Sequence, residues 1–247
     1  MSLDATHACV VDLDGVVWLA GEALPGAAEG IDELRRRDVP VLFATNNAAP
    51  TIGDLRTQLA AIGIAASDAE IVTSAQSAAA MLDADQRVLL VGEAGLREAV
   101  ERRGAVEVQR APDVVVAGLS RSFDYDACDR AAACVRSGAR FIATNTDATL
   151  PTPEGLRPGA GAILAAIATA AGREPEVAGK PTAPMVRLVR SLVDVGAVIG
   201  DRPSTDGAFA EALGVPFVLV ASQVQEACGS ATARAATLLD AVRALCA

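Results

Sequence analysis

The stretch Ala8-Cys9-Val10-Val11-Asp12-Leu13-Asp14-Gly15 decides the fold of this 247-residue chain. Four apolar residues in a row predict a strand covered on both faces, as in a parallel sheet. Two aspartates and a glycine follow where that strand ends, and glycine allows the chain to turn sharply. We therefore expect an early buried strand that presents carboxylates at its end.

The rest of the chain alternates β-branched runs with helical stretches rich in Ala, Leu, Arg and Glu. This alternation is typical of an α/β fold with a mostly parallel sheet. Further strands are predicted at 40–44, 87–92, 113–118, 140–143, 197–200 and 217–220. Helices are predicted at 27–37, 52–62, 73–82, 96–103, 125–136, 162–171, 182–193, 204–213 and 232–245. Prolines and glycines crowd 150–161, which is predicted to be a loop.

The composition narrows the classes of function. Hydrophobic residues make up 51% of the chain, enough to build a core, which excludes intrinsic disorder. No apolar run is long enough to span a membrane, and no basic stretch precedes an apolar one at the N-terminus, so we expect a cytoplasmic protein. The net charge of −10 excludes a general attraction to nucleic acid or to an anionic membrane.

Rare residues limit the chemistry further. His7 is the only histidine, which argues against a histidine triad or a multi-histidine zinc site. There are five cysteines but no Cys-x-x-Cys pair, as expected of reduced thiols. Lys180 is the only lysine among 21 basic residues, which is either chance or a place where a compact charge is needed.

Polar clusters stand at the ends of three predicted strands. They are Asp12 with Asp14, Thr45-Asn46-Asn47, and Asp201 with Asp206. Ligands bind beyond the carboxyl ends of parallel strands, so these clusters are expected to share one site. An all-oxygen donor set selects Mg²⁺, which would offset the repulsion between the carboxylates.

Each cluster alone has a simpler explanation. Asp-Gly after a strand can be an ordinary turn, and Thr45 and Asn46 can be helix caps as well as donors to phosphate oxygens. Lys180 enters a helix at the end of the dipole that disfavours a cation, which favours a role in holding an anion. The three clusters together are what point to a site.

The motifs Asp12-Leu13-Asp14-Gly15-Val16, Thr45-Asn46-Asn47, Gly179-Lys180-Pro181 and Gly200-Asp201-Arg202 with Asp206 resemble the four motifs of the haloacid dehalogenase (HAD) superfamily, in the right order. The long segment between the second and third motifs is similar to the large α/β cap of the NagD-like, para-nitrophenylphosphatase branch. The resemblance implies a doubly wound, Rossmann-like core at 1–76 and 177–247 and a smaller inserted α/β cap at 77–176.

The resemblance also implies roles. Asp12 would be the nucleophile that becomes an aspartyl phosphate, and Asp14 the general acid and base. Mg²⁺ would be held by Asp12, the backbone carbonyl of Asp14, and Asp201. The other implied roles are orientation of metal-bound water by Asp206 and binding of phosphoryl oxygens by Thr45, the Asn46 backbone and Lys180.

The cap residues are expected to choose the substrate, with Asn145, Asp147 and Arg121 as candidate contacts. The expected substrate is a small phosphorylated metabolite such as glycerol phosphate, phosphoglycolate, a sugar phosphate or a nucleoside monophosphate. Ser120 stands where many relatives carry Asp, which leaves the choice among them open. The oligomeric state is open as well, with a homodimer among the alternatives.

Three alternatives are weighed against this hypothesis. A phospho-accepting receiver also uses strand-end acids, Thr, Lys and Mg²⁺, but it is a single domain of about 120 residues without a large insert. A sugar-phosphate mutase of the same superfamily would form an isomer instead of releasing phosphate. Cys134 and Arg140 fit the Cys-x5-Arg pattern of cysteine phosphatases, but here the cysteine is predicted to close a helix and the arginine to open a strand.

Overall fold

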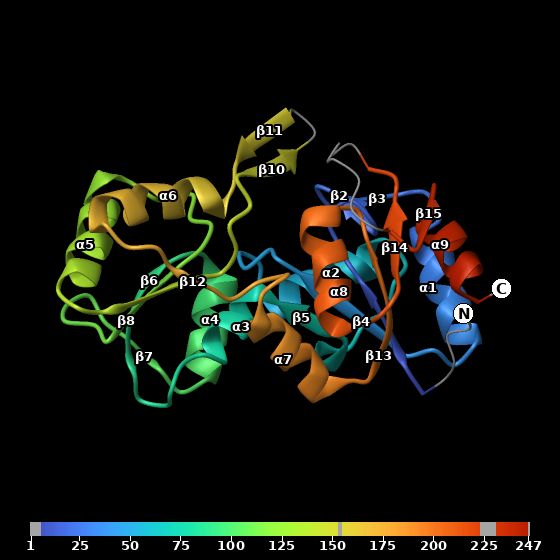
Figure 1. The fold of residues 1–247 in the computed structure, drawn as a ribbon, viewed down its shortest axis with the longest axis horizontal. Helices are drawn as coiled ribbons and strands as arrows, with labels where there is room; N and C mark the ends of the chain where they lie inside the picture. Colours follow the sequence, from blue (N-terminus) through green and yellow to red (C-terminus); the bar gives the residue numbers. More distant parts are fainter. Residues whose placement is uncertain (1–5, 153–154, 223–230, 247) are drawn as a thin grey trace. The chain divides into compact units, whose positions relative to one another are not determined.

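The computed structural model describes residues 6–152, 155–222 and 231–246. The chain divides into two compact units (Figure 1). The first comprises Met1–Thr45, Asp54–Val72 and Lys180–Ala247, and the second comprises 46–53 and Thr73–Gly179. Each unit is built around its own sheet, so the α/β class predicted from the sequence is confirmed.

The first unit contains a six-stranded sheet in the order β15-β14-β13-β1-β4-β5. β1 pairs with β4 and β13, and β14 with β13 and β15, all in parallel. The chain leaves the centre of the sheet in both directions, which is the doubly wound arrangement. The strands are β1 (Ala8–Val11), β4 (Val41–Thr45), β5 (Ile71–Thr73), β13 (Val195–Gly200), β14 (Phe217–Val220) and β15 (Ala233–Ala235).

Helices cover both faces of this sheet. On one face, α7 (Ala183–Leu192) and α8 (Ala208–Leu213) bury Met185 and Phe209 against strand residues such as Val10. On the other, α1 (Ala27–Arg36) and α9 (Leu238–Leu245) lie side by side (Figure 1). The unit also contains α2 (Ile52–Ala61, whose first two residues belong to the second unit), the 3₁₀ turn η1 (Asp68–Glu70), the π-helical turn η2 (Pro203–Gly207), and the short strands β2 (Trp18–Leu19) and β3 (Glu22–Ala23).

The second unit contains a five-stranded parallel sheet in the order β12-β9-β8-β6-β7. Its strands are β6 (Arg87–Val91), β7 (Val106–Glu107), β8 (Val114–Ala117), β9 (Arg140–Ala143) and β12 (Glu176–Val177). α3 (Ser74–Ala79) and α4 (Ala94–Arg102) pack on one face, and α5 (Tyr125–Arg136) and α6 (Ala160–Ala171) on the other. Among the described residues, no helix is long and apolar enough to cross a bilayer.

Two sequence predictions are wrong. The predicted loop at 150–161 is instead a hairpin of β10 (Thr149–Thr152) and β11 (Gly155–Pro158), followed by the start of α6. Its prolines are tolerated because a two-stranded ribbon has open edges where a missing N–H costs little. The single helix predicted at 232–245 is β15 followed by α9, because the Thr237 side chain accepts a hydrogen bond from Asp240 N and so begins the helix there.

The starts of α3 and α8 also differ from those predicted. The Thr73 hydroxyl accepts from Gln76 N, so α3 begins at Ser74 and not within the strand that precedes it. The predicted helix at 204–213 begins as the π-helical turn η2, and only its second half is α-helical.

The α1–α9 contact depends on a glycine, which gives a first prediction. A Cβ at Gly30 would lie 2.7 Å from Leu238 Cγ, whereas a Cβ at Gly53 of α2 would have only Thr51 Oγ1 near it, at 3.8 Å. Gly30→Ala should therefore lower the free energy of unfolding by about 1–3 kcal/mol. The matched variant Gly53→Ala should leave it unchanged or raise it by up to about 1 kcal/mol. Urea denaturation measures both, and equal effects would contradict the close approach.

Candidate active site

The sheet order of the first unit locates the site. β1 and β13 are neighbours, and the chain continues away from them on opposite sides. The crevice beyond their carboxyl ends is therefore the topological switch point, where open α/β sheets bind ligands. Asp12 directly follows β1 and its amide donates to Ile199 O at 2.9 Å, and Asp201 directly follows β13.

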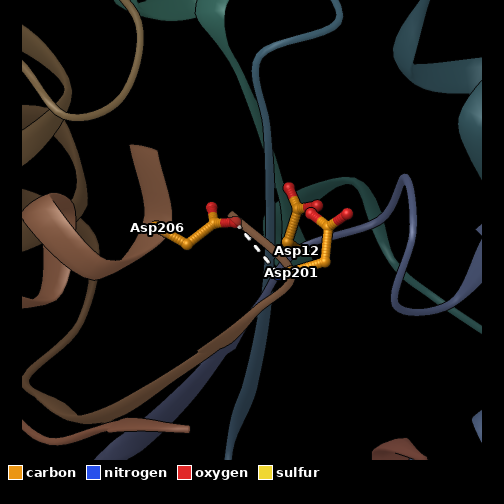
Figure 2. A group of neighbouring side chains, drawn as sticks. All are labelled: Asp12, Asp201 and Asp206. Carbon is orange, nitrogen blue, oxygen red and sulfur yellow. Dashed lines mark hydrogen bonds between the residues drawn. The ribbon is translucent and has the colours of Figure 1, made fainter. Parts of the chain in front are cut away.

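Three carboxylates meet at this switch point (Figure 2). Asp12, Asp201 and Asp206 each offer an oxygen within 4.8 Å of the others. Their residues are 8%, 4% and 1% exposed, respectively. Three acids so close together and so far from water repel one another unless positive charge is supplied.

The π-helical turn η2 brings Asp206 back toward the end of β13. Its Oδ2 accepts from the backbone N–H groups of Asp201 and Arg202, at 3.2 Å each, and Figure 2 shows the first of these bonds. A Cβ at Gly200 would lie 2.3 Å from the Asp206 side chain, so only glycine allows this return.

Lys180 supplies one positive charge to the cluster. Its Nζ donates to Asp12 Oδ1 at 2.5 Å, Asp206 Oδ1 at 2.7 Å and Ala44 O at 2.7 Å. Burial alone would lower the pKa of Lys180, but Asp12 and Asp206 raise it above its usual value, so the group stays charged. Its three hydrogens match these three acceptors on different elements, a pattern that the planar fork of Arg would not reproduce.

The single positive charge of Lys180 does not balance the three carboxylates of the cluster. Burial raises the pKa of Asp12, and the repulsion from Asp206 and Asp201 raises it further, against the opposing effect of Lys180. Burial and then Asp206 raise the pKa of Asp201 to about 6. The Oδ1 atom of Asp201 is buried and accepts no hydrogen bond from the described part of the chain.

These observations fit a divalent cation. A buried carboxylate oxygen without a donor, in an all-oxygen cluster with excess negative charge, is a suitable ligand for Mg²⁺. Asp12 and Asp201, the two side chains predicted as metal ligands, both lie in this cluster. Its third member is Asp206, whereas Asp14 was predicted to contribute only its backbone carbonyl.

The Asp14 carboxylate lies next to the cluster and accepts hydrogen bonds from two side chains of its own. The indole Nε1 of Trp18 donates to its Oδ1 at 3.1 Å, and the Thr45 hydroxyl donates to its Oδ2 at 3.4 Å. Burial raises the pKa of Asp14, whereas these hydrogen bonds and Lys180 lower it. Gly15 follows with φ +90°, and a Cβ there would lie 2.3 Å from Asp201 Oδ2, so glycine is required for two reasons.

The other predicted site residues belong to the second unit, where three of them gather. The Asn145 amide donates to Asn46 O at 2.7 Å, and the Asn46 amide donates to Asp147 Oδ2 at 3.3 Å. Asp147 N donates to Asn145 Oδ1 at 3.1 Å, which closes the group. Arg121 is not part of it: its side chain is exposed, and its backbone N–H donates to Glu93 Oε1 at 2.6 Å.

The Cys-x5-Arg alternative does not fit the structure. Cys134 lies in the last turn of α5 and Arg140 begins β9, the reverse of the order that a cysteine-phosphatase loop requires. Arg140 is paired with Glu176 at 3.1 Å. Burial raises the pKa of the Cys134 thiol, so it is not an activated nucleophile.

Sequence reasoning did not find two partners in the site, Trp18 and Ala44 O. The first could have been suspected as the only tryptophan of the chain, four residues after Asp14. The second is a backbone carbonyl and leaves no signal in a sequence.

Comparison with known proteins agrees with this geometry. Residues 9–106 match the family described as haloacid dehalogenase-like hydrolase, and residues 177–245 match a HAD-hydrolase-like family. The D-glycerol 3-phosphate phosphatase of Mycobacterium tuberculosis is 38% identical over 236 residues, covering 92% of this chain and 66% of that protein. The chain thus spans about two thirds of that relative's length.

Solved structures show the same relationship. The glycerol phosphate phosphatase of Mycobacterium tuberculosis in complex with magnesium is 36% identical with a TM-score of 0.83, covering 92% of this chain and 71% of that one. NagD from E. coli is 28% identical with a TM-score of 0.86, covering 97% and 98%. The chain therefore belongs to the haloacid dehalogenase-like hydrolases. Within that superfamily it belongs to the NagD-like branch.

The repulsion at Asp201 gives a second prediction. A pKa raised from 3.8 to about 6 means that the folded chain holds this proton more tightly than the unfolded chain does. The charged carboxylate therefore lowers the free energy of unfolding. This loss is absent below about pH 4 and develops as the pH rises through 6. Without metal at pH 7.5, Asp201→Asn should therefore raise the free energy of unfolding by about 1–3 kcal/mol.

Two controls accompany this measurement. The gain should shrink as the pH falls toward 4, and Asp32→Asn on the exposed side of α1 should show none. Magnesium should stabilise the unmodified protein much more than Asp201→Asn. A variant that is less stable than the unmodified protein in chelator would contradict the electrostatic argument.

Proposed function

We propose that this chain is a magnesium-dependent phosphomonoesterase that hydrolyses a small phosphorylated metabolite through an aspartyl phosphate. One observation carries the proposal: a buried aspartate at the switch point is paired with the only lysine and lies within 4.8 Å of a second strand-end acid. The magnesium-bound phosphatase relative supports both the reaction and the metal.

Asp12 is the nucleophile of the proposed reaction. Its Oδ1 is held by Lys180, which leaves Oδ2 as the oxygen that attacks phosphorus. The P–O bond to the substrate alcohol breaks as the bond to Asp12 forms, and water later cleaves the acyl phosphate. Lys180 stays next to the reacting group and offsets part of the charge of the phosphoryl oxygens.

Asp14 moves the proton in both halves of the reaction. As an acid it protonates the departing alkoxide, and as a base it then takes a proton from the attacking water. Its raised pKa helps the first role, because a protonated carboxyl persists closer to neutral pH. Thr45 and the Asn46 backbone are the other proposed donors to the phosphoryl oxygens.

The proposed ligands of Mg²⁺ are Asp12, Asp201 and the backbone carbonyl of Asp14, with Asp206 behind them. When bound, the cation supplies Lewis-acid chemistry by neutralising the carboxylates and polarising the phosphoryl group. Asp206 holds the backbone of Asp201 and Arg202 and thereby fixes the end of β13.

We assign the catalytic core to 1–76 and 177–247 and the cap to 77–176. The compact units support this division except at the connections, because 46–53, 73–76 and 177–179 belong to the second unit. Arg121, Asn145 and Asp147 remain the candidate substrate contacts. The Asn145 amide also donates to Asn46 O, which holds Asn145 against the segment that follows β4.

The substrate we propose first is glycerol phosphate, because the relative from Mycobacterium tuberculosis acts on glycerol 3-phosphate. We also propose a cytoplasmic location, supported by the free thiols of Cys9, Cys128, Cys134 and Cys246; Cys228 lies outside the described residues. A homodimer stays a prediction that light scattering would test.

The nucleophile gives a third prediction. Asp12→Asn should lower magnesium-dependent release of phosphate from p-nitrophenyl phosphate by at least about 10³-fold, because an amide cannot form the acyl phosphate. Asp32→Asn, which removes an exposed carboxylate, should keep the original rate. Near-original activity in Asp12→Asn would remove this residue as the nucleophile.

The substrate and the metal give a fourth prediction. In a panel of glycerol phosphates, phosphoglycolate, sugar phosphates and nucleoside monophosphates, inorganic phosphate should appear only with Mg²⁺ and stop on addition of chelator. A colorimetric assay measures the inorganic phosphate that is released. Isomerised product without free phosphate would identify a mutase instead.

A further inference from the structure

Trp18 is tied to Asp14 by both its backbone and its side chain. Gly15 N donates to Trp18 O at 2.7 Å, and Trp18 N donates to Leu13 O at 3.1 Å, so the chain after β1 folds back on itself. A β-bridge joins Asp14 and Trp18 directly. Trp18 is 3% exposed, and its indole Nε1 lies 3.1 Å from Asp14 Oδ1.

The chemistry of the two partners makes the oxygens of Asp14 unequal. An indole N–H can only donate, so Oδ1 must accept whether the carboxyl group is charged or neutral. The partner of Oδ2 is the Thr45 hydroxyl at 3.4 Å, which can either donate or accept. A proton carried by Asp14 is therefore favoured on Oδ2, because Oδ1 accepts from the indole better as a carbonyl oxygen than as a hydroxyl oxygen.

We propose that Trp18 is a positioning residue that fixes the Asp14 carboxyl group and confines its transferable proton to Oδ2. This inference rests on the proposed function, in which Asp14 is the acid and base. In the first half-reaction the Oδ2–H bond breaks and the proton passes to the alcohol oxygen, whose bond to phosphorus breaks as Asp12 bonds to phosphorus. In the second half-reaction, water gives a proton to Oδ2 and its hydroxide to phosphorus as the bond between phosphorus and Asp12 breaks, which releases phosphate and restores both aspartates.

Removal of the indole N–H should act mainly on the acid step. The carboxyl group could then rotate and carry its proton on either oxygen, so fewer molecules would present an acid to the leaving group. A nitrophenolate leaves without an acid, whereas a poorer leaving group depends on protonation. The loss should therefore grow as the pKa of the leaving alcohol rises.

The test compares kcat/KM, which covers the steps up to release of the alcohol, for substituted phenyl phosphates and for glycerol 3-phosphate. Trp18→Phe should lower kcat/KM for p-nitrophenyl phosphate by less than about 5-fold and for glycerol 3-phosphate by about 10–100-fold more. The dependence of the rate on the pKa of the leaving group should become steeper. A loss that is equal for all substrates would show a merely structural role and overturn the proposal.

Because Trp18 is the only tryptophan, analogues can replace it alone. A benzothienyl analogue, in which sulfur takes the place of the N–H, should reproduce the steeper dependence. The matched control, 5-fluorotryptophan, keeps the N–H and should not. These two analogues test the role of the hydrogen bond even if Trp18→Phe fails to fold. The same leaving-group dependence with both analogues would refute that role.

Asp14→Asn and Asp12→Asn distinguish a failure of the role of Trp18 from a failure of the proposed function. If Asp14→Asn steepens the leaving-group dependence and removal of the indole N–H does not, only the role of Trp18 is wrong. If Asp14→Asn leaves the dependence unchanged, or if Asp12→Asn stays active, the proposed function itself is wrong.

Discussion

The site in the first unit depends on one interaction, the buried contact between the ammonium group of Lys180 and the carboxylates of Asp12 and Asp206. It joins the end of β1, the start of the segment before α7 and the turn η2, which are distant in the sequence. Burial and Asp206 nevertheless raise the pKa of Asp201 to about 6, and its Oδ1 has no hydrogen-bond donor among the described residues. The fold therefore holds a site that is electrostatically incomplete, and a divalent cation completes it.

Close approach of backbone and side chain is the second constraint, and it follows from the first. The cluster is compact only because Gly15 and Gly200 leave room for Asp201 and Asp206, respectively. A side chain at either position would occupy space that a carboxylate already fills. The positive φ of Gly15 and the π-helical turn are local irregularities of this geometry, and such irregularities are usual at functional sites.

Several parts of this arrangement could be predicted from the sequence. The apolar run before Asp12, the helix-strand alternation and the order of the motifs led to the α/β class and to the acids at the strand ends. The hairpin at 149–158 could not be found by composition, because Pro and Gly mark loops and open ribbons alike. The start of α9 was present in the sequence as Thr237 and Asp240, but a strand and a helix of similar composition were read as one helix.

The sequence by itself determined which chemical groups stand at the strand ends, because apolar runs and the alternation of strands and helices are local properties of the sequence. Only the tertiary structure decided which atoms meet: that Lys180 reaches Ala44 O, that the Trp18 indole lies on Oδ1 of Asp14, and that the Asn145 amide holds Asn46 O. The lysine and asparagine contacts join residues more than 90 positions apart. The indole contact joins near neighbours, but it requires the turn at Gly15, which is formed against Asp201 from the other half of the sheet. Such contacts depend on strand order and side-chain direction, and no local pattern of residues encodes either of them.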